Sequence, residues 1–376
     1  MRSARARRAR IRVLIAALVC LAAALPVGAG TAHADESAVP KVHPSLFASA
    51  PVNATKPDDI TMLGNRLYVT YQNNAGKDGT PPGSMSTIVA FDRATGHVAA
   101  TYALTGRCDG LTADPETGRL FASVNEDLNS SLYVITPGSG SPIAHYTYSP
   151  SPAETGSDAT NGGTDAISVG PDGAVYVAHS NPDTNLTPPN NTAAVYHLTL
   201  DGTIARLTRL FGVNDTATVV NPALGTPATA PLNLTDPDSN RLIPGRAGGT
   251  LIQVAQADSK LVFATHLRSS QPRLRQLGLT NATPPAGGAA TPQLDDITRV
   301  NGEGTLYAVD QLSGNIYAID TNDIEPGTYI VSQPKPTSSD LPNTPALGVV
   351  DLHTGVVTHI DSTLGSPKGL LFVRDN

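Results

Sequence analysis

The sequence predicts an all-β protein, a β-propeller of six blades with four antiparallel strands each. A short phrase of Asp, any residue and then Ile or Leu recurs along the chain, and an apolar triplet rich in Tyr and Phe follows it. In addition, the 34 Gly and 31 Pro among 376 residues are too many for a helical bundle, because both residues break helices. Four short strands per repeat are typical of a propeller blade.

The repeat has six starts from residue 57 onward. The starts are Asp58-Asp59-Ile60, Asp109-Gly110-Leu111, Asp165-Ala166-Ile167, a weaker Thr250-Leu251-Ile252, Asp295-Asp296-Ile297 and Lys368-Gly369-Leu370. The triplets that follow the first five are Leu67-Tyr68-Val69, Leu120-Phe121-Ala122, Val175-Tyr176-Val177, Leu261-Val262-Phe263 and Leu306-Tyr307-Ala308. We expect each start to open the innermost strand of a blade and each triplet to lie on the second strand.

The uneven spacing of the starts is explained by loops and by the way the ring closes. Residues 212–249 and 324–346 are rich in Pro, Thr or Asn and are interpreted as loop insertions. Little chain follows Lys368, so the stretch near Val42 to Ala50 is expected to complete the last blade as an outer strand. Five or seven blades, or a β-sandwich, are the alternative folds.

The first 34 residues have the pattern of a secretory signal peptide. Six Arg and no acid precede an apolar run from Val13 to Leu25, and an Ala-x-Ala exit ends at Ala34. The run of thirteen residues is too short to cross a bilayer. We therefore expect cleavage after Ala34 and one secreted domain, residues 35–376, with no membrane span.

Charge and cysteine content restrict the partners. Cleavage leaves 19 basic against 32 acidic residues, a net charge of −13, which argues against nucleic acid as a partner. Cys108 is the one cysteine after Ala34, so no internal disulfide is possible, and we expect a buried, inert thiol. A monomer that binds a small molecule or a carbohydrate fits this composition.

The repeat places acidic side chains on one face. The start of a blade's first strand and the end of its second strand lie at the same end of the channel, which we call the channel mouth. Asp58, Asp109, Asp165 and Asp295 are therefore predicted to converge there, together with Thr250 and Lys368. The second-strand ends expected beside them are Gln72, Asn125, His179, His266, Asp310 and Gln311.

Two interpretations of these aspartates stay open. Converging carboxylates repel one another and need distance and water, Lys368 as counter-ion, or a bound divalent cation such as Ca²⁺, which takes oxygen ligands. Alternatively, each Asp caps the turn that enters its strand. The separate stretch Asp236-Pro237-Asp238-Ser239-Asn240 is interpreted as a solvated turn.

Several phrases resemble the senescence marker protein/gluconolactonase family and the related NHL-type propellers. They are Cys108-Asp109-Gly110-Leu111, Gly173-Ala174-Val175-Tyr176-Val177-Ala178 and Ser366-Pro367-Lys368-Gly369-Leu370-Leu371-Phe372. The resemblance implies six blades and one divalent cation in the channel. It implies Asp58, Asp109, Asp165 and Asp295 as metal ligands, with Lys368 at a position where a ligand could stand.

The resemblance also implies hydrolysis of a lactone or ester. The cation would polarise the carbonyl, and a metal-bound Asp or His179, oriented by Asp310, would handle the proton on water. The alternative function is a non-catalytic propeller that binds a ligand, a glycan or a protein, because propellers serve both classes.

Overall fold

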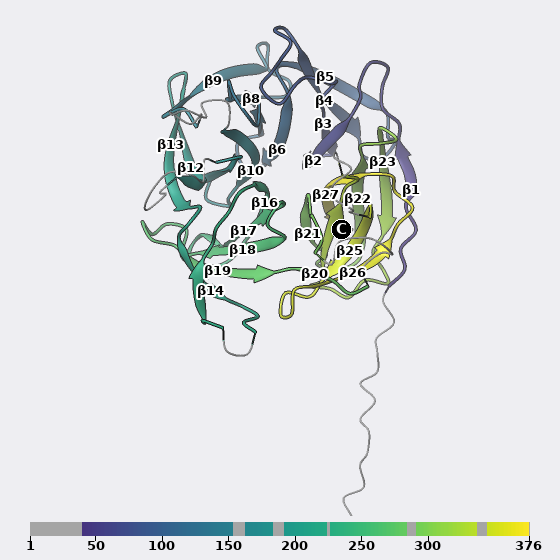
Figure 1. Ribbon diagram of the computed structural model, residues 1–376. Coiled ribbons are helices and arrows are strands. Elements are labelled where there is room, and N and C mark those ends of the chain that lie inside the picture. Colours follow the sequence, from purple (N-terminus) through teal and green to yellow (C-terminus); the bar gives the residue numbers. More distant parts are fainter. Residues whose placement is uncertain are drawn as a thin grey trace, which may run out of the picture. The chain divides into compact units, whose positions relative to one another are not determined.

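The computed structural model describes residues 40–152, 162–182, 192–223, 226–283, 291–336 and 344–375, so the expected signal peptide lies outside the described residues. Between Val39 and Asn376 the chain is a β-propeller, as Figure 1 shows, and the predicted fold class is confirmed. Among the described residues the helix is η1 (Arg246–Gly248), a single turn. No described helix has the length and apolar character needed to cross a membrane.

The described strands form six antiparallel groups of four, each ordered from the innermost strand outward. The first two groups are β2 (Pro57–Leu63), β3 (Arg66–Tyr71), β4 (Met85–Asp92), β5 (Val98–Thr105), and β6 (Cys108–Asp114), β7 (Arg119–Val124), β8 (Ser131–Ile135), β9 (Ile143–Ser149). The third and fourth are β10 (Gly163–Val169), β11 (Val175–Ser180), β12 (Ala193–Asp201), β13 (Ile204–Gly212), and β16 (Pro237–Ile243), β17 (Thr250–Ala255), β18 (Lys260–Thr265), β19 (Arg273–Gly278). The last two are β21 (Ile297–Arg299), β24 (Tyr329–Gln333), β25 (Ala346–Val350), β26 (Val356–Asp361), and β27 (Pro367–Arg374), β22 (Gly304–Asp310), β23 (Asn315–Asp320), β1 (Ser45–Ala48).

The remaining short strands extend the outer edges of these groups. β14 (Thr216–Val219) and β15 (Thr229–Pro231) add to the group of β16, and β20 (Thr280–Asn281) adds to that of β21. The second and third groups join into one sheet because their outer strands, β9 and β13, pair in parallel. The outer edges are thus partly covered, which protects their unpaired backbone groups.

The inner strands form a closed circuit. β2 contacts β6, and the contacts continue through β10, β16, β21 and β27 back to β2. The apolar core follows the same circuit, because each of six buried clusters lies between two neighbouring groups. Ile88 and Leu120, for example, meet between the first and second groups. Each sheet therefore buries both faces against its neighbours, which a single four-stranded sheet cannot do alone.

A β-bulge explains the repeated phrase. In β2 the pairing with β3 runs from Pro57 opposite Tyr71 to Ile60 opposite Val69, so two residues of β2 face one of β3. Four other inner strands have the same irregularity, after Cys108, Thr164 and Pro237, and before Leu370. Bulges re-aim side chains, so the same residue of each phrase takes an equivalent position around the ring.

The fourth start of the repeat was assigned wrongly. Thr250 opens β17, the second strand of its group, and the innermost strand is β16. β16 lies inside 212–249, which we expected to be a loop, and it carries the bulge at Asp238-Ser239. Its Pro and Asp content resembled a turn because a bulged strand entrance uses the same residues.

The strand that follows the fifth start was also assigned wrongly. The triplet Leu306-Tyr307-Ala308 lies on β22, and β22 pairs with β27 of the last group. The partner of β21 is β24, which lies inside the expected insertion 324–346. The expected closure is confirmed, because β1 pairs with β23 and completes the group of β27.

Candidate functional site

The bulges bring together a set of side chains that we call the mouth ring. It consists of Asp58, Asp109, Asp165, Asp238, Asp295 and Lys368, one from the start of each inner strand or from the residues just before it. Charge interactions link Asp58 to Asp109 and Asp109 to Asp165, and link Asp165 to Asp238 and Asp238 to Asp295. The predicted convergence of four aspartates is therefore observed, and a fifth, Asp238, joins them.

Lys368 neutralises one side of the ring. Its Nζ donates a hydrogen bond to Oδ1 of Asp295 at 2.5 Å and lies 3.4 Å from Oδ1 of Asp58. Burial alone would lower the pKa of Lys368, but the charges of Asp295 and Asp58 raise it well above its ordinary value. For Asp295, burial raises the pKa to about 7 although Lys368 opposes the shift. Lys368 is thus a fixed cation beside a carboxyl group that titrates near neutral pH.

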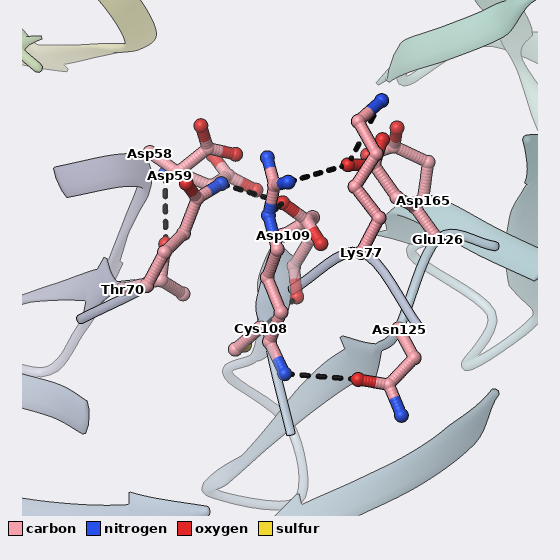
Figure 2. Close-up of polar contacts among 12 residues, drawn as sticks. Asp58, Asp59, Thr70, Lys77, Cys108, Asp109, Asn125, Glu126 and Asp165 are labelled. Carbon is pink, nitrogen blue, oxygen red and sulfur yellow. Dashed lines mark hydrogen bonds and ion pairs between the residues drawn. The ribbon is translucent and has the colours of Figure 1, made fainter. Parts of the chain in front are cut away.

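Arg107 neutralises a second side. Its Nε donates to Oδ1 of Asp109 at 2.9 Å, and another guanidinium nitrogen lies 2.9 Å from Oε1 of Glu126. Lys77 adds a second cation 3.3 Å from the same Glu126 oxygen. Figure 2 shows Lys77, Asp109, Glu126 and Asp165 grouped together, with Asp58 on the other side of Asp109.

Asp109 is held tightly and still has a free oxygen. Its Oδ1 also accepts a hydrogen bond from Nε2 of Gln72 at 2.6 Å. Within the described part of the chain, Oδ2 of Asp109 is buried and has no hydrogen-bond partner. Burial raises the pKa of Asp109 well above its ordinary value, with Arg107 opposing and Glu126 and Asp58 adding to the shift. A ligand with a hydrogen-bond donor would satisfy this oxygen.

Asp165 lies mainly among other carboxylates. Burial raises its pKa, and the charges of Glu126, Asp109, Asp58 and Asp236 raise it further and have larger effects than the nearby Arg107 has. Burial also raises the pKa of the neighbouring Asp238, and the charge of Asp165 adds to that shift. The ring therefore has direct ion pairs at Lys368 and Arg107, whereas Asp165 and Asp238 form no ion pair with another described residue.

We considered that the first aspartate of each phrase, such as Asp58, caps the turn into its strand, but the second residue of the bulge makes these bonds. Asp59 accepts hydrogen bonds from the backbone N–H groups of Ile60 and, across to the next inner strand, Leu111, both at 2.7 Å. Asp296 repeats this with Ile297 and Leu370, also at 2.7 Å. Figure 2 shows the further bond by which Oγ1 of Thr70 accepts from the backbone of Asp59. These two carboxylates join neighbouring strands, which leaves the mouth ring available for other contacts.

A cavity of about 150 Å³ lies between the inner strands beside these capping residues. Asp59, Asp296, Ser168, Asn240 and Arg241 are among its lining residues. The Arg241 guanidinium lies 2.8 Å from Oδ2 of Asp296 and donates to the backbone carbonyls of Ile297 and Leu370, so three of its five N–H groups hold strands together. We assign this region to structure.

The other predicted residues have mainly structural contacts. His179 is buried, and its ring nitrogens lie 2.7 Å and 2.9 Å from the carbonyl oxygens of Ala193 and Pro152. Burial lowers the pKa of His179. Asp310 accepts hydrogen bonds from the backbone N–H groups of Leu312, Gly365 and Ser366, which joins the turn after β22 to the segment before β27. Their catalytic roles stay predictions.

His266 was expected at the mouth on the assumption that β18 is a second strand. It follows the end of β18, the third strand of its group, and that strand runs in the opposite direction to β17. The expectation about His266 is therefore wrong. Cys108 is buried, as expected, and burial raises the pKa of its thiol.

The divalent cation implied by the resemblance does not fit the arrangement of these side chains. Among the described residues, no group of three or more His, Cys, Asp or Glu is placed to hold a metal ion. The ammonium of Lys368 lies against Asp295 and Asp58, and Arg107 lies against Asp109. Two protein cations thus engage three of the four predicted ligands.

Three members of the site were missed in the sequence. Asp238 was hidden because its strand follows a long segment rich in Pro and Asn. Arg107 and Glu126 stand next to residues that had been singled out, Cys108 and Asn125, and the strand-end position of Glu126 was a usable signal. Their pairing depends on the fold and could not be read from spacing.

Comparison with known proteins gives a likeness in fold. No family model matches the chain, and no curated protein matches it in sequence. A periplasmic gluconolactonase from Pseudomonas aeruginosa has 14% identity and a TM-score of 0.46, over 84% of this chain and 88% of its own. Proteins from Bacteroides caccae, of unknown function, and Lactobacillus plantarum have 10% and 13% identity and TM-scores of 0.47 and 0.46. These two alignments each cover 85% of this chain, with 87% and 89% of the other.

Proposed function

We propose that the channel mouth binds a small ligand with a positively charged group, an amine or a guanidine, and that the protein is an exported binding propeller. The observation that carries this is the group of buried carboxylates around Asp165, on which Glu126, Asp109, Asp58 and Asp236 act more strongly than the cation Arg107 does. An ammonium group placed there would offset the repulsion among these buried acids. The unpartnered Oδ2 of Asp109 offers the same ligand a hydrogen-bond acceptor.

Ligand binding is expected to release protons. The carboxyl groups of Asp165 and Asp109 have raised pKa values, so they hold protons over a pH range in which ordinary aspartates are ionised. A bound cation favours the ionised form and lowers these pKa values again. Affinity for the cationic ligand should therefore rise with pH through the range in which these groups titrate.

A thermal-shift panel of primary amines, guanidines, quaternary ammonium compounds and neutral sugars tests the proposal. The cationic probes should raise the Tm of the wild type, because they bind the folded state, and the sugars should not. Asp165→Asn should abolish the shift, whereas Asp201→Asn, on the exposed end of β12, should keep it. Equal shifts in wild type and Asp165→Asn, or shifts with the neutral sugars alone, would contradict the proposal and favour a glycan ligand.

Hydrolysis of a lactone or ester is the second candidate. It is favoured by Asp295, whose pKa of about 7 suits a general base, and by the adjacent ammonium of Lys368. Asp295 would take a proton from water as the water oxygen bonds to the carbonyl carbon. Lys368 would stabilise the oxyanion, and the alkoxide would leave with the proton held by Asp295.

A panel of lactones and aryl esters separates the two candidates. Hydrolysis should be lost in Asp295→Asn and unaffected by a chelator, because no step passes through a metal. His179→Gln and Asp310→Asn belong in the same panel, since they test the catalytic roles predicted for these residues. No turnover of any substrate by the wild type would leave binding as the function.

Export is part of the proposal and has its own test. Residues 1–34 should be removed, so N-terminal sequencing of the protein recovered from outside the cytoplasm should begin at Asp35. An N-terminus at Met1 in the mature protein would contradict it. Size-exclusion chromatography of the same material should give a monomer.

A further inference from the structure

Lys368 stands at the position that carries an aspartate in the other five groups. In β27, Leu370 lies opposite Ala308 and Pro367 opposite Asp310, so Lys368 and Gly369 form the bulge. In β6 the equivalent residues are Asp109 and Gly110, between Cys108 opposite Val124 and Leu111 opposite Ala122. The lysine is therefore an aspartate replacement in an otherwise acidic ring.

The ammonium of Lys368 is directed at its two neighbours in the ring. Asp295 belongs to the preceding group and Asp58 to the first group, on either side of β27, and Nζ contacts both. Asp238 also acts on Lys368 through its charge. The Lys368 side chain is only 17% exposed, so the charge is held inside the mouth.

The carboxylate oxygen of Asp58 that lies near Lys368 also accepts a hydrogen bond from another side chain. Nε2 of Gln311 donates to Oδ1 of Asp58 at 3.1 Å, so that oxygen serves both Gln311 and Lys368. A divalent ion at this place would have to displace Lys368 and would be repelled by its charge. Asp58, Asp238 and Asp295 are not placed to hold a metal ion while Lys368 is present, but with the ammonium removed their side chains could turn toward one another and supply the oxygen ligands that Ca²⁺ accepts.

We propose that Lys368 is a built-in substitute for a metal ion, which keeps divalent cations out of the mouth, and that loss of its ammonium opens a Ca²⁺ site at Asp58, Asp238 and Asp295. The native protein is then independent of divalent metal. This inference does not depend on the amine ligand proposed above, because it rests on the contacts of Lys368 with Asp58 and Asp295, whereas amine binding is tested at Asp165.

Calcium titration of wild type and Lys368→Asn tests the proposal. Lys368→Asn should gain Ca²⁺ affinity on the order of tenfold or more, the effect expected from removing one like charge beside the ion. Its Tm should rise with added Ca²⁺, and Tb³⁺ should compete. Lys368→Arg keeps a tethered cation, and Lys335→Met removes an exposed lysine, so both should behave as the wild type does.

Three outcomes would overturn the proposal. One is saturable Ca²⁺ binding by the wild type that Asp295→Asn abolishes, and another is a folded Lys368→Asn without any gain in binding. If Lys368→Asn does not fold alone, refolding with and without Ca²⁺ replaces the titration. Recovery of folded Lys368→Asn only when Ca²⁺ is present supports the proposal. The third contrary outcome is that Lys368→Asn is not recovered in either condition although Lys368→Arg folds. Amine binding is measured in a separate experiment with Asp165→Asn, so either proposal can fail without the other failing.

Discussion

The pH dependence of stability should reveal the buried carboxyl group of Asp295. Its pKa is about 7 in the folded protein, against an ordinary value of 3.8. A raised carboxyl pKa means that the folded state holds the proton more tightly than the unfolded chain does. The resulting stabilisation is complete below the ordinary pKa and is lost as pH rises through about 7. Asp295→Asn mimics the protonated carboxyl group and removes this dependence.

The size of the effect follows from the shift. One pKa unit corresponds to about 1.4 kcal/mol, so a shift from 3.8 to about 7 corresponds to about 4 kcal/mol. About two fifths of this is lost by about pH 5 and almost all of the rest by about pH 8. Between those two pH values the free energy of unfolding of the wild type should therefore fall by roughly 2–3 kcal/mol relative to the variant.

Urea denaturation at several pH values between these limits measures the difference directly. Asp201→Asn removes an exposed carboxylate on β12 and should leave the wild-type profile unchanged in shape. Parallel profiles for wild type and Asp295→Asn would refute the reasoning, because they would mean that Asp295 ionises equally well in the folded and unfolded states.

Three further changes test other parts of the structure. Lys368→Met leaves Asp58 and Asp295 without their ammonium, so it should lower the free energy of unfolding near neutral pH by about 3–5 kcal/mol, measured by urea denaturation. The control Lys335→Met should change this free energy by less than about 0.5 kcal/mol. Equal losses of stability in the two variants would contradict the ion-pair assignment. Gly110→Ala should cost about 1–3 kcal/mol, because a Cβ there would lie 2.5 Å from the carbonyl oxygen of Asp165. Gly140→Ala, where a Cβ meets nothing within 4 Å, is its control, and an equally stable Gly110→Ala would show that the inner strands can separate. Asp59→Asn retains one acceptor oxygen for two backbone N–H groups and should cost about 1–3 kcal/mol by the same assay; an unchanged midpoint would mean that these bonds do not join β2 to β6.

The propeller could be predicted because its repeat is local. Each phrase of Asp58-Asp59-Ile60 type encodes a bulged strand entrance, and each apolar triplet encodes the buried strand that follows it. The start of β16, at Asp238, has a different composition, so the repeat was not recognised there. The second strand of that group was therefore taken for the innermost one. Where the chain leaves one group and returns, as between β21 and β24, the order of strands along the chain predicted the wrong partner.

The candidate site was predictable in its members and not in its electrostatics. Equal positions in the repeat indicated that Asp58, Asp109, Asp165 and Asp295 converge, and they do. The repeat did not reveal that Arg107, two residues from Asp109, would turn back to it. Side-chain direction depends on neighbouring strands, so a counter-ion cannot be assigned from spacing alone.

By itself, the sequence determined a β-rich repeating chain, an N-terminal segment with the pattern of a signal peptide, and an excess of acids at equivalent positions, because these depend on composition and short-range order. The tertiary structure alone decided which strand is innermost in the fourth group and which strand β22 pairs with. It also decided that Lys368 and Arg107 hold the carboxylates of the mouth. These features depend on contacts between residues up to 310 positions apart, such as Lys368 and Asp58, and charge compensation at such separations is set by packing.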